Sequence, residues 1–227
     1  MAVRWFGGDA SLAPPPPPPE KPQPLRDDTP KFTSFHSSYV GGDGEDSVVA
    51  LAHTKHAGAV WLGGHTASST GVGVSAAGAA ARARPAGMED GFVALLTTAG
   101  SIGTLRYYGG DADDRVTALA PDGDGGVLVA GYTESDTWST VRLAGHVAGR
   151  RDAFILHQTS RGAVSGALRI GGGDDDEARA IALRNGVLWV VGNTESVDLP
   201  TTKGAPRASR GGGGRDGFIV ALKFSAV

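Results

Sequence analysis

Clusters of acidic residues occur at three places in the sequence, and their carboxylates are the groups that could do chemistry. The clusters read GDGED from residue 42, DADD from residue 111 and GDDDE from residue 173. Paired carboxylates can act as acid and base on glycans, and the candidate catalytic residues of such an enzyme are Asp113, Asp114, Asp175 and Asp176. Carboxylates clustered on turns can also bind calcium, but no cluster has the spacing of a calcium loop. We therefore expect solvated turns and no cofactor, with calcium as the only metal left open.

Two other stretches have patterns that ligand sites use. GGGRDG, from Gly212, satisfies G-x-G-x-x-G, but a strand (FIVAL) follows it where a nucleotide site needs the N-terminus of a helix. APPPPPPEKPQP, from Ala13, favours a polyproline II helix, which is either a linker or a ligand for aromatic grooves. We expect a linker; the residues of the ligand alternative are Pro14, Pro15, Pro16, Pro17, Pro18 and Pro19. The sequence has no G-x-S-x-G, S-x-x-K or H-E-x-x-H motif, so no catalytic residue is assigned.

Charge and composition limit the classes of partner. The chain has 21 basic and 24 acidic residues, a formal net charge of -3, and lacks the positive field that nucleic acid or anionic lipid requires. The absence of cysteine excludes disulfides, thiolate nucleophiles and thiolate-bound zinc. No apolar stretch approaches the roughly 20 residues of a membrane span, and the first residues lack the apolar core of a signal peptide. We expect a soluble protein with no nucleic-acid partner and no membrane span, and the compartment stays open.

The acidic clusters belong to a longer segment that is repeated three times. YVGGDGEDSVVALA starts at Tyr39, YYGGDADDRVTALA at Tyr107 and IGGGDDDEARAIAL at Ile170. Each copy contains a double glycine, followed by acidic residues and a small apolar run. We expect the glycines to turn the backbone at positive φ; they are Gly41, Gly42, Gly109, Gly110, Gly171 and Gly172.

A second repeated landmark predicts a short strand that ends in Gly-x-Thr. It reads VWLGGHT from Val60, VLVAGYT from Val127 and VLWVVGNT from Val187. Trp61, Leu128 and Trp189 each lie three residues before the glycine of that ending. Because side chains alternate between the two faces of a strand, the three large side chains should occupy the same face.

A third landmark is an aspartate that leads into a strand with a phenylalanine two residues later. The stretches DGFVALL, DAFILHQ and DGFIVAL supply Asp90, Phe92, Asp152, Phe154, Asp216 and Phe218. We expect the aspartates to accept backbone hydrogen bonds in the preceding turn. A fourth strand follows in SIGTLRYYGG and AVSGALRIGG. Four short strands joined by glycine-rich turns are typical of the blade of an all-β propeller.

The order of these landmarks resembles the bacterial beta-propeller repeat family known as SBBP repeats. The C-terminal unit, GNTESVDLPTTKGAPRASRGGGGRDGFIVALKF over residues 192–224, is the most similar, whereas the other two units lack the LPTT step. The resemblance covers residues 32–227. It implies a β-propeller, often found on secreted or cell-surface proteins, and it implies no catalytic residues.

The predicted organisation is a propeller domain over residues 32–227 that follows a disordered proline-rich segment, residues 1–31. The repeats cover residues 43–110, 111–172 and 173–227, and strand 32–42 supplies the fourth strand of the last blade. Three four-stranded blades are fewer than the about 4 to 8 of closed propellers. We therefore expect either a ring completed by a head-to-tail homodimer or an incomplete ring. RWFGGDA at residues 4–10 nearly repeats RYYGGDA at residues 106–112, as a remnant of a further blade would.

Our first hypothesis for the function is a non-enzymatic propeller module, a scaffold that binds a protein or a glycan. One alternative is a propeller enzyme that acts on glycans as a lyase or hydrolase, with the carboxylates named above at the mouth of its channel. The other is a fragment of a larger propeller without an independent function.

Overall fold

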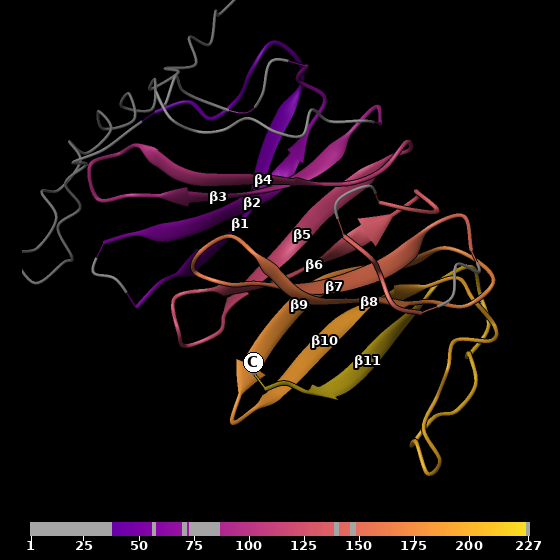
Figure 1. The fold of residues 1–227 in the computed structure, drawn as a ribbon. Coiled ribbons are helices and arrows are strands. Elements are labelled where there is room, and N and C mark those ends of the chain that lie inside the picture. Colours follow the sequence, from indigo (N-terminus) through magenta and orange to yellow (C-terminus); the bar gives the residue numbers. More distant parts are fainter. Residues whose placement is uncertain are drawn as a thin grey trace, which may run out of the picture. The chain divides into compact units, whose positions relative to one another are not determined.

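The computed structural model describes residues 38–55, 58–69, 72, 87–138, 141–145 and 149–225. Within these residues the regular elements are β-strands, in three antiparallel sheets of four, four and three strands (Figure 1). The first sheet contains β1 (Asp46–His53), β2 (Val60–Thr66), β3 (Asp90–Leu96) and β4 (Ile102–Tyr108). The second contains β5 (Asp114–Pro121), β6 (Val127–Thr133), β7 (Asp152–Gln158) and β8 (Val164–Ile170), and the third contains β9 (Asp176–Arg184), β10 (Val187–Thr194) and β11 (Asp216–Lys223).

The strands that the repeated landmarks predict are present, which confirms the all-β class. The Gly-x-Thr landmark forms β2, β6 and β10, and the Asp-x-Phe landmark forms β3, β7 and β11. The third sheet has three strands in the described part of the chain, where a fourth was predicted from residues 32–42. Residues 38–42 are not in a strand, and residues 32–37 lie outside the described residues, as do the segment 1–31 and its prolines. No helix among the described residues has the length and apolar character needed to cross a membrane.

Each sheet has an irregularity in its first strand, opposite the glycine of the Gly-x-Thr landmark. The register shifts between Val48 and Ala50 in β1 and between Val116 and Ala118 in β5, and β9 has the same irregularity opposite Gly192. Such a bulge bends the strand and increases its twist. The repetition of the bulge means that the three sheets share their local geometry as well as their strand order.

The three sheets stack in chain order, with the second sheet between the other two (Figure 1). The first and second sheets enclose a core that includes Trp61 and Val93 from one side and Phe154 and Leu156 from the other. The second and third sheets enclose an equivalent core, which includes Leu128. Burial of such large apolar side chains stabilises each by about 1.5–3 kcal/mol, so the faces between sheets hold the stack together.

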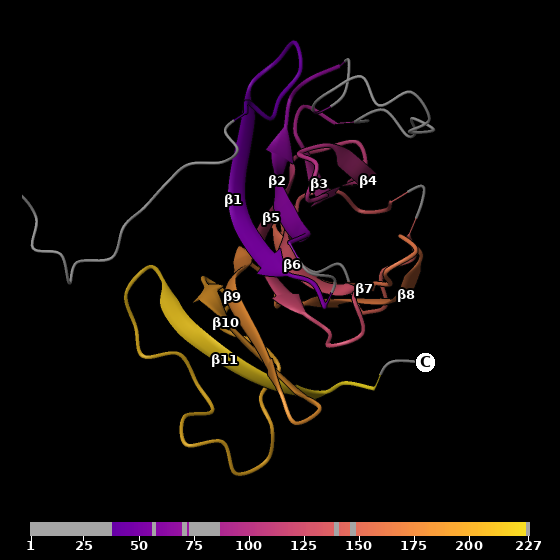
Figure 2. The same cartoon turned by 90° about the vertical axis from the view of Figure 1, so that its left-hand side faces the viewer.

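The first strands of the sheets, β1, β5 and β9, lie next to one another (Figure 2). On the side of the first sheet that faces away from the second, Val72, Phe92, Ala94 and Ile102 form a smaller core, against which Val40 packs. Each phenylalanine of the Asp-x-Phe landmark therefore lies on the face of its sheet that is turned away from the next sheet in chain order. Because the repeats are equivalent, the residues in contact at one junction between sheets identify, by their positions in the repeat, the residues expected in contact at the next junction.

Candidate functional site

Each double glycine forms a corner around the aspartate that begins the first strand of a sheet. The second glycine donates its backbone N–H to the carboxylate, and a serine from the Thr-x-Ser turn after the second strand donates its hydroxyl at 2.7 Å. The backbone bonds are 2.7–2.8 Å long and join Gly42 to Asp46, Gly110 to Asp114 and Gly172 to Asp176. The serines are Ser68, Ser135 and Ser196. These aspartates therefore hold the corners of the fold together.

The first glycines of the second and third pairs, Gly109 and Gly171, are required by close packing, and the predicted positive φ is wrong. None of the six double-glycine residues has a φ in the left-handed region. A Cβ at Gly109 would overlap Asp90 Oδ1 and lie 2.8 Å from Asp114 Oδ2. A Cβ at Gly171 would overlap Asp152 Oδ1. Two carboxylates approach the glycine from different strands, and only a residue without a side chain leaves room for them.

The aspartates that begin the third strands have two different roles. Asp90 accepts the backbone N–H of Gly87 at 3.3 Å, and Asp216 accepts that of Gly211 at 3.0 Å, which confirms the predicted turn hydrogen bonds. Asp152 forms a buried ion pair with Arg169, at 3.2 Å. A buried arginine is stable only when it is paired and hydrogen-bonded, and Arg169 also donates to two backbone carbonyls.

The pKa values of two corner aspartates, Asp46 and Asp114, shift in opposite directions. The pKa of Asp114 is raised above 3.8 because burial disfavours its charged form more than its four hydrogen-bond donors favour it. At Asp46 burial also raises the pKa, but hydrogen bonds from Thr66, Gly42 and Ser68 outweigh this effect and lower it below 3.8. The two residues occupy equivalent positions, and Asp46 differs because no sheet covers it in the described residues.

The four candidate catalytic carboxylates do not form one site. Asp114 and Asp176 belong to the corners of different sheets and accept internal hydrogen bonds. Asp175 pairs with Arg150, and the backbone carbonyl of Asp113 accepts a bond from the chain after β6. The carboxylates of Asp114, Asp175 and Asp176 therefore have structural partners, whereas a buried oxygen of the Asp113 carboxylate, Oδ1, has no hydrogen-bond partner among the described residues. The enzyme hypothesis therefore gains no supporting observation.

The stretch PDGDGG, which is nearest to a calcium loop, forms the β5–β6 hairpin. Asp122 Oδ1 accepts the backbone N–H of Asp124 at 2.7 Å, and Asp122 Oδ2 lies 2.8 Å from His157 Nε2. Both carboxylate oxygens of Asp122 therefore have protein partners. Elsewhere in the described ranges, too, no group of three or more histidine, aspartate or glutamate side chains could hold a metal ion.

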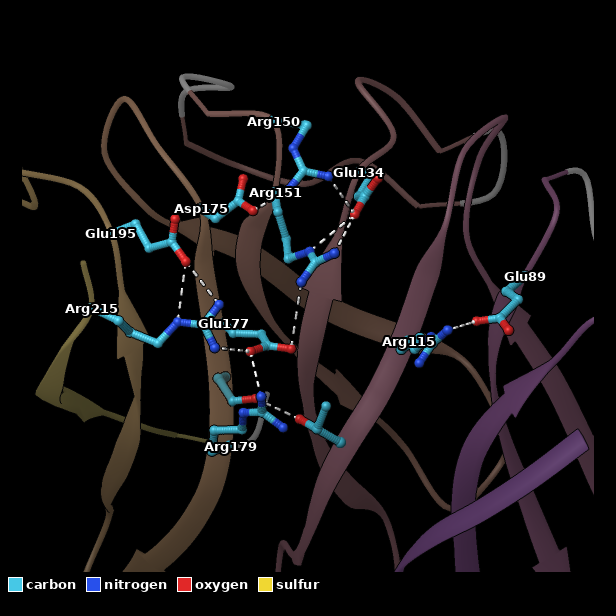
Figure 3. Close-up of polar contacts among 12 residues, drawn as sticks. Glu89, Arg115, Glu134, Arg150, Arg151, Asp175, Glu177, Arg179, Glu195 and Arg215 are labelled. Carbon is cyan, nitrogen blue, oxygen red and sulfur yellow. Dashed lines mark hydrogen bonds and ion pairs between the residues drawn. The ribbon is translucent and has the colours of Figure 1, made fainter.

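A row of ion pairs connects neighbouring sheets near the starts of their strands (Figure 3). Glu89, just before β3, pairs with Arg115 of β5. At the next junction the signs are reversed, with Arg151 before β7 lying 3.9 Å from Glu177 of β9. Arg151 is held more closely by Glu134, at 2.6 Å, and its guanidinium stacks on a tyrosine ring. The acidic and basic residues exchange places between the two junctions, and the attraction is kept. These residues therefore stabilise the junctions between sheets.

The third sheet has one apolar face that no sheet covers in the described part of the chain. Trp61 and Leu128 are 0% and 1% exposed because the next sheet packs on them, as their predicted common face requires. Their equivalent, Trp189, is 46% exposed. Ile219 is 65% exposed, although its equivalents in β3 and β7 are buried against the next sheet. We name this surface the open face, formed by Ala180, Ala182, Trp189, Val191, Ile219 and Ala221.

A hollow of about 510 Å³ lies beside the open face. Trp189 and Ile219 line one side of it, and the loop between β10 and β11 lines the other. That loop contributes Val197 and Leu199 and also the cationic Arg207, together with prolines and small residues. The site therefore offers an apolar surface with a positively charged edge.

The sequence contained a signal for this site that the motif search did not use. Alignment of the repeats places Trp189 with Trp61 and Leu128, whose face is covered by the next sheet. The same alignment pairs the oppositely charged positions of Glu89 and Arg115 with those of Arg151 and Glu177. Both signals require comparison between repeats, because neither is visible within one of them.

No protein-family model matches the sequence, and a search of the curated proteins gives no significant match. The resemblance to the SBBP repeats therefore rests on the residues quoted for it and stays a prediction. The open face and its hollow are the candidate site on structural grounds alone.

Proposed function

We propose that the chain is a non-enzymatic module of the β-propeller type that binds a protein partner on its open face. The observation that carries the proposal is the exposure of Trp189, whose equivalents Trp61 and Leu128 are buried under a neighbouring sheet. Contiguous exposed apolar residues mark interaction surfaces, and tryptophan is among the residues that dominate binding energy at interfaces.

The propeller part of the proposal is supported by the way the sheets stack. They follow one another in chain order, with β1, β5 and β9 side by side, as the inner strands of blades are. The resemblance to the SBBP repeats favours the same architecture. Three sheets do not form a closed ring here, and closed propellers have about 4 to 8 blades.

A protein partner fits the open face better than a glycan does. The six residues that define the face are apolar and offer no side-chain hydrogen bond except that of the Trp189 indole. A site for a small polar ligand needs several placed polar groups to fix its orientation. A flat apolar surface with a charged edge is instead the usual composition of a protein interface.

A photoactivatable crosslinking residue at position 219, in the full chain made in its producing cells, tests this function. We expect a protein adduct of discrete mass that disappears when Trp189→Glu is added, because a carboxylate there would have to be desolvated. The same crosslinker in place of Met88, which is 77% exposed and outside the open face, is the control and should not give this adduct. A yield of adduct that Trp189→Glu leaves unchanged, or no adduct at all, would refute the proposal.

A further inference from the structure

At the internal junctions, the face equivalent to the open face is covered by apolar residues of the next sheet. The first sheet of the chain carries residues equivalent to those. At the junction of the first two sheets, Val116 and Leu119 pack over Gly63, where an added Cβ would lie 2.9 and 3.1 Å from them. Their equivalents in the first strand of the chain are Val48 and Leu51, which are 44% and 63% exposed. The exposed part of the outer face of the first sheet is therefore its β1 edge, since Phe92 and Ala94 of β3 are already buried in the smaller core.

Backbone groups at the two ends of the stack are complementary in the same way. At each internal junction, the aspartate that begins a sheet donates its backbone N–H to the carbonyl just before the third strand of the preceding sheet. These bonds join Asp114 to Glu89 at 2.9 Å and Asp176 to Arg151 at 2.8 Å. Continuation of the pattern pairs Asp46 of a following unit with Arg215.

A repeated glycine marks the place where the following unit approaches. Three residues before the third strand, a Cβ at Gly87 would overlap the carbonyl of Ala112, and a Cβ at Gly149 would overlap that of Asp174. Both carbonyls belong to the corner of the next sheet. At the third glycine of this series, Gly213, an added Cβ would meet no described atom within 4 Å. Gly213 has a φ of +82°, whereas Gly87 and Gly149 lie outside the left-handed region, so the backbone conformation also accounts for glycine at this position.

The charges at the two ends are opposite. The loop before β11 carries Lys203, Arg207, Arg210 and Arg215 against Glu195 and Asp198. Two of its arginines pair within the chain, Arg210 with Asp216 and Arg215 with Glu195. The corner before β1, which the repeat pattern would place beside that loop, carries Asp43, Glu45 and Asp46. Electrostatic complementarity of this kind favours the correct partner and register.

We infer that the open face binds the outer face of the first sheet of a second copy of this chain, an inference that rests on the proposed function. The contact places Val48 and Leu51 of one copy against Val191 of the other, at the position that Gly63 holds in the first internal junction, with Trp189 beside it. Because Val191 has a side chain where Gly63 has none, the two sheets must lie farther apart here than at that junction. The contact is heterologous, so two copies complete it twice and close a ring of six sheets, within the range of closed propellers. The partner of the module is then the module itself.

Two full-length variants, each with one defective end, test this contact. Leu51→Glu damages only the outer face of the first sheet, and Trp189→Glu damages only the open face; both residues are exposed enough to be replaced without disturbing the core. By light scattering we expect wild type at twice 23.0 kDa and each variant alone at 23.0 kDa. A mixture of the two variants retains one intact contact and should return to twice 23.0 kDa. Met88→Glu is the matched control and should remain at the wild-type mass.

The possible results separate the inference from the proposed function. A wild-type monomer at every concentration overturns the second-copy inference, and the proposed function survives it if residue 219 crosslinks to a different protein. A dimer that both variants retain places the contact elsewhere and also overturns the inference. Failure of the mixture to associate, with wild type dimeric, indicates a symmetric contact in place of the head-to-tail one and overturns the inference too. A cooperative thermal unfolding transition and the wild-type circular dichroism spectrum for each variant show that loss of mass is not loss of fold; the Tm itself should fall when the partner is lost.

Discussion

Replacement of Gly131 by alanine should destabilise the module strongly, because the glycine lies where two fixed groups meet. An added methyl would overlap the backbone carbonyl oxygen of Arg115, at the bulge of β5, and would lie 2.8 Å from Phe154 Cε1. Neither group can withdraw easily, since the carbonyl is part of the sheet and Phe154 is fully buried in the core between sheets. Overpacking of a core costs about 1–3 kcal/mol, and this site should reach the upper end.

The assay is thermal unfolding followed by circular dichroism, with Gly166→Ala as the matched control. A loss of about 3 kcal/mol should lower the Tm by about 6–12 °C, at about 2–4 °C per kcal/mol for a unit of this size. Gly166 lies in β8 of the same sheet, outside the left-handed region, and an added Cβ would meet no atom within 4 Å. Alanine there should be neutral or stabilise by up to about 1 kcal/mol. Equal melting temperatures for the two variants would refute the packing explanation.

Three further changes test the corners and junctions. Ser135→Ala removes a donor to Asp114 and should cost about 1–3 kcal/mol in the free energy of unfolding, measured by urea denaturation. Arg151→Lys keeps the charge but loses the two-nitrogen contact to its glutamate and the stacking on tyrosine, so we expect a loss of about 1 kcal/mol in the same assay. Arg179→Lys, at an exposed arginine with a one-nitrogen contact to Glu177, is the control and should show no measurable change. Carboxyl NMR titration should place the pKa of Asp46 below 3.8 and that of Asp114 above it. Asp46 thus contributes stability above pH 3.8, and this contribution is lost as the pH falls through its folded pKa. The contribution of Asp114 is present below pH 3.8 and is lost as the pH rises through its folded pKa. The reverse order of the two pKa values would contradict the burial argument.

Sequence patterns were sufficient for the strands of the repeated landmarks, because each of these strands is encoded locally by its own alternation and turns; the strand predicted over residues 32–42 is absent from its described part, residues 38–42. The Gly-x-Thr and Asp-x-Phe landmarks predicted β2, β3, β6, β7, β10 and β11 at their observed places. The role of the double glycines was not predictable in the same way. At Gly109 the restriction comes from Asp90 and Asp114, and only the folded structure shows that their carboxylates converge there.

The candidate site was partly predictable from the sequence. The equivalence of Trp61, Leu128 and Trp189 placed the three side chains on one face, but whether a neighbour covers that face depends on how sheets stack. The acidic clusters attracted a catalytic interpretation because clustered carboxylates are typical of active sites. In the structure Asp114 and Asp176 satisfy backbone and serine donors, a structural role that composition alone cannot distinguish from catalysis.

The claim that a second copy covers the open face is tested most directly by the solvent exposure of Trp189 in solution. Fluorine NMR of the chain labelled with 5-fluorotryptophan, with Trp189→Phe to assign the signal, measures that exposure through the shift between light and heavy water. We expect the solvent shift of Trp189 to fall toward that of the buried Trp61 as the protein concentration rises. A Trp189 signal that keeps the full shift of a half-exposed indole at the highest concentration would contradict the claim.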